Sequence, residues 1–325
     1  MAHRESEMKG RNSLVSFGVA LACAGLFGCG GGGGGGGSSG LPQPPSTPIS
    51  INASNINQVT DASLDPAVGG TGAFGASISS ADSPQSNPRA LLRAMQAVST
   101  QAKKPRSSSG LSDAPEEGAC LESGSVTITA SGNSATIRFN NCSDFPGQVI
   151  NGTVSATGMV EGTNSFQANF SVDITFSESG SQALRLVGNF SISETCDSSG
   201  NCTGTFSGSS LGAAHGAEVW FISSFNITSV ESGGFIDVTA NYRVSSNQLN
   251  GSVLVSTNGP IRFASGANYP QSGIINITGA NSSARITITS SNPVDTNAVQ
   301  VQVDADGDAV FETTNSYSWD QLEAI

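Results

Sequence analysis

The chain has 325 residues, a formal net charge of −12 at pH 7 and few charged side chains, 12% of the total. An acidic chain of this kind is not expected to bind nucleic acid or an anionic membrane surface through its charge. Its 40 glycines, together with many Ser, Thr, Asn and β-branched residues, favour a strand-rich exported protein over a helical enzyme.

Residues 1–28 have the layout of a secretory signal peptide. Arg4, Lys9 and Arg11 precede an apolar stretch that ends at Phe27. This stretch is shorter than the roughly 20 residues that cross a bilayer. We therefore expect the leader to direct export and then to be removed.

The run Leu26-Phe27-Gly28-Cys29 resembles the lipobox of bacterial lipoproteins. The resemblance implies that Cys29 becomes the first residue and carries fatty-acyl chains such as palmitate, and several chains would anchor the protein stably. Gly30 stands where an acidic residue, in the lipoproteins that this chain resembles, tends to retain the protein at the inner membrane. The expected location is the cell outer membrane, with its periplasmic or surface face left open.

Residues 29–86 are predicted to be a tether, because glycine, serine and proline dominate and residues 30–37 are all glycine. The only good helix prediction covers residues 87–104, where Asn87 suits the N-cap, Pro88 suits the first helical position and Pro105 ends the helix. Residues 105–117 are predicted to be a linker.

Residues 118–325 are predicted to form an antiparallel β domain. Apolar and polar residues alternate from Phe166 to Phe176 and again from Ile236 to Val244, which indicates strands with one buried and one wet face. The succession of hairpins favours a strongly curved antiparallel sheet, a half-barrel or a sandwich. The domain is allowed to divide near residue 259, which would leave a small C-terminal β unit. The predicted fold class is therefore mainly β, preceded by a disordered tether and one short helix.

Four cysteines remain once the leader is removed and Cys29 is acylated: Cys120, Cys142, Cys196 and Cys202. An even number in an exported chain predicts two disulfides, and we favour the most local of the three pairings, Cys120–Cys142 with Cys196–Cys202. The alternative, a four-thiolate metal site, lacks the closely spaced cysteine pairs that such sites usually have.

One group of residues has the composition of a cation site: Asp304, Asp306, Asp308 and Glu312. Carboxylates are hard oxygen ligands that suit Ca²⁺, the one possible cofactor of this chain. The competing interpretation is a two-residue hairpin turn at Asp306-Gly307, in which Asp304 and Asp308 would point to opposite faces and would not share an ion.

The sequence carries no nucleophile elbow, phosphate-binding loop or dinucleotide fingerprint. His215, the only histidine after the leader, is interpreted as structural. We therefore expect a non-catalytic binding or structural role, with a partner beyond the membrane left open. One alternative is a periplasmic carrier with an apolar cavity lined by Phe166, Phe170, Ile174, Phe176 and Phe190. A less favoured alternative is a hydrolase that gathers carboxylates such as Asp173 and Asp237 in one cleft.

Overall fold

The computed structural model describes residues 40–64, 116–120, 122–143, 148–162, 164–178, 183–265, 267 and 269–322. Its strands are β1 (Glu116–Ala119), β2 (Ser123–Ser131), β3 (Ser134–Ser143), β4 (Gln148–Gly162), β5 (Ser165–Glu178), β6 (Leu184–Cys196), β7 (Cys202–His215), β8 (Glu218–Ser232), β9 (Phe235–Ser246), β10 (Gly251–Thr257), β11 (Ile261–Ala264), β12 (Gly273–Thr278), β13 (Ser283–Ile288), β14 (Val299–Asp304) and β15 (Thr313–Tyr317). Helices cover residues 56–64 and α4 (Trp319–Leu322).

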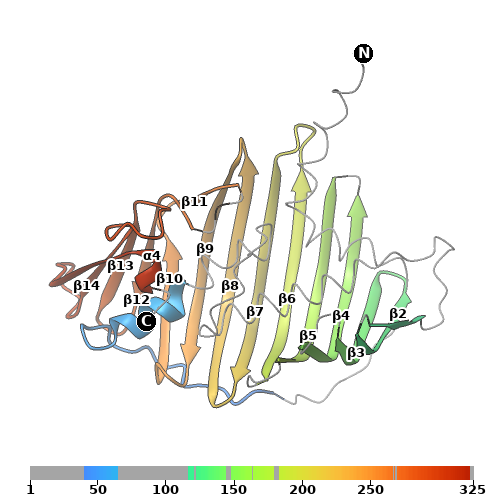
Figure 1. Ribbon diagram of the computed structural model, residues 1–325. Coiled ribbons are helices and arrows are strands. Elements are labelled where there is room, and N and C mark those ends of the chain that lie inside the picture. Colours follow the sequence, from blue (N-terminus) through green and yellow to red (C-terminus); the bar gives the residue numbers. More distant parts are fainter. Residues whose placement is uncertain are drawn as a thin grey trace, which may run out of the picture.

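All the strands belong to one antiparallel sheet that is not closed (Figure 1). Their order follows the chain from β1 at one edge to β15 at the other, except that β11 pairs with β9 and β12 takes the place beside β10. The predicted mainly β, antiparallel and curved fold is confirmed. The sheet also continues through the suggested sub-boundary near residue 259, because β10 pairs directly with β12.

Strict alternation gives the long strands two different faces. On β5, the residues from Phe166 to Phe176 that were predicted to be apolar and inward are buried, whereas Gln167, Asn169 and Ser171 between them are exposed. We call the two sides of the sheet the apolar face and the polar face. Burial of the apolar face is the main stabilising term, at about 25 cal/mol for each Å² removed from water.

A ladder of four phenylalanine rings crosses the apolar face. Phe170, Phe190, Phe206 and Phe225 come from β5, β6, β7 and β8, and successive ring centroids lie 5.1, 5.1 and 4.9 Å apart. Gly208 is required beside the last ring, because a Cβ at this position would collide with Phe225 and would lie 2.7 Å from the carbonyl oxygen of Asn189. The ladder therefore depends on the large phenylalanine rings and also on a glycine that leaves room for the last of them.

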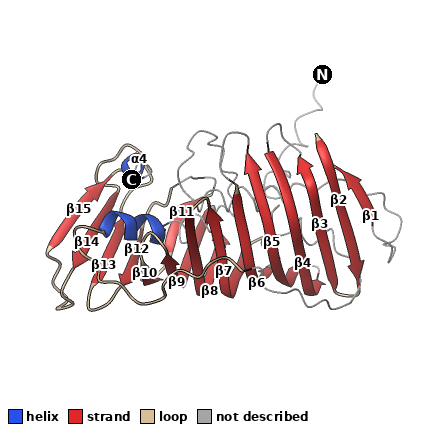
Figure 2. Ribbon diagram, turned by 90° about the horizontal axis from the view of Figure 1, so that it is seen from below, coloured by secondary structure: helices blue, strands red, loops and turns tan. Residues whose placement is uncertain are grey.

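At its C-terminal end the sheet curls around the two helices (Figure 2). The helix over residues 56–64 lies on the apolar face, where the Tyr242 hydroxyl of β9 donates a hydrogen bond to the backbone oxygen of Ser63. Trp319 of α4 is buried and stacks on Tyr269, with ring centroids 5.1 Å apart. Both helices therefore belong to the same hydrophobic core as the strands.

Residues 47–51, which we call the strap, fill a gap in the sheet. β10 pairs with β12 only from Leu254 onward, and the strap bonds to the earlier part of β10. The amide of Ile49 donates to the oxygen of Ser252 (3.1 Å), and the amide of Ser252 donates to the oxygen of Thr47 (2.9 Å). On the other side of the strap, the amide of Ala280 donates to the oxygen of Ile49 (2.7 Å).

The prediction of a tether over residues 29–86 is therefore wrong for residues 40–64. Ile51, Ile56 and Val59 are buried in the core, although the local sequence is dominated by polar residues and proline. Their partners lie far away along the chain, as in the bond from the Ile51 amide to the Ser282 hydroxyl, 231 residues apart. The leader and the predicted 87–104 helix lie outside the described residues, and β1 begins within the predicted linker.

Candidate functional site

The predicted cation group lies in the connection between β14 and β15. Asp304 is the last residue of β14 and is buried, whereas Asp306, Asp308 and Glu312 are exposed. One ligand atom from each of the four carboxylates lies within 4.8 Å of all the others. Two oxygens on opposite sides of a Ca²⁺ ion lie about 4.8 Å apart, at the usual Ca²⁺–oxygen distance of roughly 2.4 Å, so the spacing of the four carboxylates is of the size that a calcium site requires.

The carboxylates are also held by the backbone of their own loop. Asp304 accepts hydrogen bonds from the amides of Gly307 (2.7 Å) and Ala309 (3.1 Å), and Glu312 accepts one from the amide of Ala305 (2.8 Å). These amides compensate part of the negative charge without a cation. Among the described residues, no Lys or Arg forms an ion pair with the four carboxylates.

The competing two-residue hairpin is wrong. β14 ends at Asp304 and β15 begins at Thr313, so residues 305–312 form a wide loop rather than a strand after an Asp306-Gly307 turn. Ala309 adopts a left-handed conformation, with φ of 69°, and in this loop a ligand atom of Asp304 lies within 4.8 Å of one of Asp308. Calcium binding by this loop stays a prediction.

We expect Ca²⁺ to produce binding heat in a calorimetric titration and to raise the melting temperature of the protein. Asp306→Asn is the matched variant, because Asp306 is exposed and caps only one amide, that of Asp308; its fold should persist while the response to calcium is lost. A wild-type protein that shows neither heat nor a change in melting temperature would end the calcium prediction.

Both predicted disulfides are present. Cys120–Cys142 joins the residue after β1 to the end of β3, with Cα atoms 5.5 Å apart, and Cys196–Cys202 joins the end of β6 to the start of β7, with Cα atoms 4.0 Å apart. The alternative of a four-thiolate metal site is wrong, because all four sulfurs are bonded in pairs. Cys29 lies outside the described residues.

Removing Cys120–Cys142 is expected to destabilise the protein more than removing Cys196–Cys202. The paired cysteines are 22 and 6 residues apart, and the entropy of closing these loops in the unfolded chain corresponds to about 3 and about 2 kcal/mol. Urea unfolding of the two double Cys→Ala variants measures this difference. Equal losses of stability would show that loop length does not control the contribution of these bonds.

The carboxylates suggested for a hydrolase are not brought together. Asp173 of β5 pairs with Arg185 (3.1 Å), and Asp237 of β9 pairs with Arg262 (2.6 Å). The hydrogen bond from Arg262 lowers the pKa of Asp237. Four strand spacings separate β5 from β9, which corresponds to about 19 Å. Each carboxylate therefore serves a separate cross-strand ion pair.

The five residues suggested for an apolar cavity all lie on the apolar face and are buried. Phe170 stacks on Phe190 with an angle of 19° between the rings, and all five belong to the continuous core. His215 is at the end of β7, opposite Glu218 of β8.

No family model, curated protein or solved structure was found to match this chain. Among the helices of the described residues, none has the length and apolar character that a membrane crossing requires.

Sequence reasoning missed Glu194. On β6 this residue occupies an inward position in line with Leu184, Leu186 and Ile192, and only 5% of its surface is exposed. The sequence signal for it is a charged residue at a position where the alternation of the strand places apolar side chains. Burial, with a smaller contribution from Glu231, raises the pKa of Glu194, and burial also raises the pKa of Glu231.

The raised pKa of Glu194 predicts how stability changes with pH. Between the ordinary and the raised pKa, the folded protein binds more protons than the unfolded chain, so the free energy of unfolding falls as the pH rises through this window. Glu194→Gln is expected to make the free energy of unfolding depend less on pH in this window, as measured by urea unfolding between about pH 4 and pH 7. The same slope in the variant and the wild type would contradict this assignment.

Proposed function

We propose that this chain is an exported lipoprotein, anchored to the outer membrane through Cys29, whose β-sheet body has a non-catalytic binding or structural role. The observation that carries the proposal is the pairing of all four cysteines of the body. Disulfides of this kind form in oxidising compartments outside the cytoplasm, as expected if residues 1–28 direct export.

The polar face supports a role in binding or assembly. Between the Asp173–Arg185 and Asp237–Arg262 ion pairs it displays mainly uncharged groups, among them Asn189, Ser191, Thr203, Thr205, Thr228 and Thr239. Such a face offers hydrogen-bond donors and acceptors to a partner without the positive charge that attracts nucleic acid. The alternative role as a carrier of an apolar ligand has less support, because the rings of the apolar face stack on one another.

The proposed anchor would hold the body close to the membrane. Leu41 packs with Val219 and Phe221 on the polar face, near the turn between β7 and β8. Residues 30–40 would then be the whole tether, and covalent geometry limits its reach to about 40 Å. This tether is much shorter than one reaching residue 86.

The test is the Cys29→Ser variant, followed by intact-mass analysis and by fractionation of the cell envelope. We expect the acyl mass and the membrane association to disappear together. Cys23→Ser is the matched control, because Cys23 lies in the predicted leader and its loss should change neither. A bare Cys29 in membrane-extracted protein, or membrane association that survives Cys29→Ser, would overturn the proposed anchor.

A further inference from the structure

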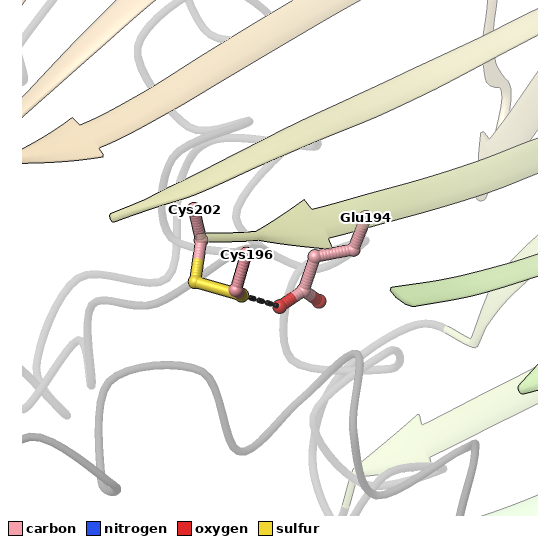
Figure 3. Close-up of side chains that lie close together, drawn as sticks. All are labelled: Glu194, Cys196 and Cys202. Atoms are coloured by element: carbon pink, nitrogen blue, oxygen red, sulfur yellow. Dashed lines mark hydrogen bonds between the residues drawn. A yellow bond between two sulfur atoms is a disulfide. The ribbon is translucent and has the colours of Figure 1, made fainter. Parts of the chain in front are cut away.

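The Cys196–Cys202 disulfide has a buried carboxyl group beside it. Oε1 of Glu194 lies 3.3 Å from Sγ of Cys196 (Figure 3). The second oxygen of the same carboxyl, Oε2, is buried and has no hydrogen-bond partner. A ligand atom of Glu194 and the two sulfurs all lie within 4.8 Å of one another. Buried carboxyl oxygens normally have partners, so this one calls for an explanation.

The contact between Glu194 and Cys196 depends on a proton. A disulfide sulfur has no hydrogen to donate, so in the oxidised state only a protonated Glu194 can donate across this distance. In the reduced state the roles are reversed, because the Cys196 thiol can donate to the ionised carboxylate. Because the pKa of Glu194 is raised, it lies closer to the pKa of a thiol than that of an ordinary carboxyl does. A proton transfer from the Cys196 thiol to Glu194 therefore costs less free energy.

The surroundings allow the bond to open without unfolding the sheet. Cys196 and Cys202 are direct cross-strand partners, and the ladder of β6 and β7 continues from them through Glu194 opposite Gly204 to Leu184 opposite His215. The turn beyond them has its own bonds, since the Asp197 carboxylate accepts from the amides of Ser199 and Asn201. The two sulfurs would therefore stay close after reduction.

The two cysteine residues differ in their exposure to solvent. Cys196 is half-buried next to the exposed turn at residues 197–201, whereas Cys202 is 7% exposed. The other disulfide is more enclosed as a whole, because Cys142 is fully buried and Cys120 is buried as well. An external reagent should therefore meet Cys196 first.

We propose that Cys196 and Cys202 form a redox-active pair that exchanges with external thiols and disulfides, with Cys196 as the attacking sulfur and Glu194 as the carrier of its proton.

In the reduced protein, Glu194 takes the proton of Cys196, and the thiolate attacks one sulfur of an external disulfide RS–SR. A Cys196–SR bond forms, and one RS⁻ leaves. Cys202 then loses its proton and attacks Cys196, which restores the internal disulfide and releases the second RS⁻. The two protons of the dithiol end on the two RS⁻ groups, so the protein is oxidised and RS–SR is reduced to 2 RSH.

The same steps in reverse reduce the internal disulfide at the expense of an external dithiol. When the mixed disulfide Cys196–SR is cleaved at its outer sulfur, Cys196 leaves as a thiolate and Glu194 returns the proton to it. Glu231 of β8 and Asp197 of the turn are the described acidic groups around this centre. Glu231 raises the pKa of Glu194 by its charge, whereas Asp197 is engaged in the turn.

The first experiment follows both disulfides of the full chain during native reduction by dithiothreitol, with alkylation and peptide mass mapping to report on each cysteine separately. Cys120–Cys142 is the internal control. We expect Cys196–Cys202 to open faster by about tenfold or more, since Cys196 is the more exposed cysteine and has Glu194 beside it as a proton carrier. Equal rates for the two bonds, or opening only under unfolding conditions, would overturn the proposal.

The second experiment assigns the roles with oxidised glutathione as the probe. Cys202→Ser leaves Cys196 as the free thiol, and Cys196→Ser leaves Cys202; the first should form the mixed disulfide about tenfold faster. Adding Glu194→Gln to Cys202→Ser should slow this reaction about tenfold and remove the inflection of Glu194 from its pH profile. Glu231→Gln in the same background should instead move that inflection to lower pH.

The pH profile separates proton transfer from a merely structural role of Glu194. If Glu194→Gln leaves both the rate and the pH profile of Cys196 unchanged, Glu194 carries no proton in the exchange. If the two single thiols react at the same rate, Cys196 is not the attacking sulfur. Neither result depends on the state of Cys29, so failure here is distinct from failure of the proposed anchor.

Discussion

Replacing Gly279 by alanine is expected to destabilise the protein by about 3 kcal/mol or more, as overpacking against rigid backbone does. A Cβ at this position would collide with the carbonyl oxygen of Ile49 and would lie 2.9 Å from Cγ1 of Ile51. The oxygen of Ile49 is fixed, because it accepts the hydrogen bond from Ala280. The strap would have to leave its place between β10 and the β12–β13 turn, and Ile51 would lose its burial.

Urea unfolding of Gly279→Ala beside Gly118→Ala tests this expectation. Gly118 lies in β1, where a Cβ would make only an ordinary contact, 3.6 Å from Val126, so its replacement should change stability by less than about 0.5 kcal/mol. Ile51→Ala removes the same anchor without adding bulk and should cost about 2–5 kcal/mol. If Gly279→Ala unfolds at the same urea concentration as the wild type, the strap does not stabilise the sheet.

Replacing Phe190 by alanine is expected to cost about 4 kcal/mol, the second large effect. Phe190 stands inside the ladder and contacts two rings, those of Phe170 and Phe206, at centroid distances of 5.1 Å each. It is also buried on the apolar face. The expected loss of stability has three contributions. They are the lost burial of the ring, the two lost aromatic contacts and the cavity that alanine leaves.

Two variants separate these contributions in thermal or urea unfolding. Phe190→Leu fills much of the space and should cost clearly less than alanine, about 1–2 kcal/mol. Phe235→Ala removes a ring that is 38% exposed and has Arg262 over its face at 5.2 Å, so a cost below about 1 kcal/mol is expected. A Phe190→Ala loss as small as that of Phe235→Ala would contradict the importance of the ladder.

Where sequence reasoning succeeded, the pattern was local. Alternation on β5 and β9 depends only on the period of two in an extended chain, so it can be read from neighbouring residues. The disulfide pairing followed from spacing, because Cys196 and Cys202 flank a single turn and Cys120 and Cys142 flank a hairpin. The wide acidic loop was misread because an Asp-Gly pair suits a tight turn as well as a longer connection.

The sequence by itself determined that this body is an antiparallel sheet with one apolar and one polar face, and it favoured the two local disulfides. Only the tertiary structure decided that the strap completes the sheet, that the four carboxylates of the acidic loop converge, and that Glu194 is buried against a disulfide. The physical reason is distance along the chain. Alternation and turns are properties of adjacent residues, whereas the burial of Ile51 or Glu194 depends on surfaces that exist only when distant segments have come together.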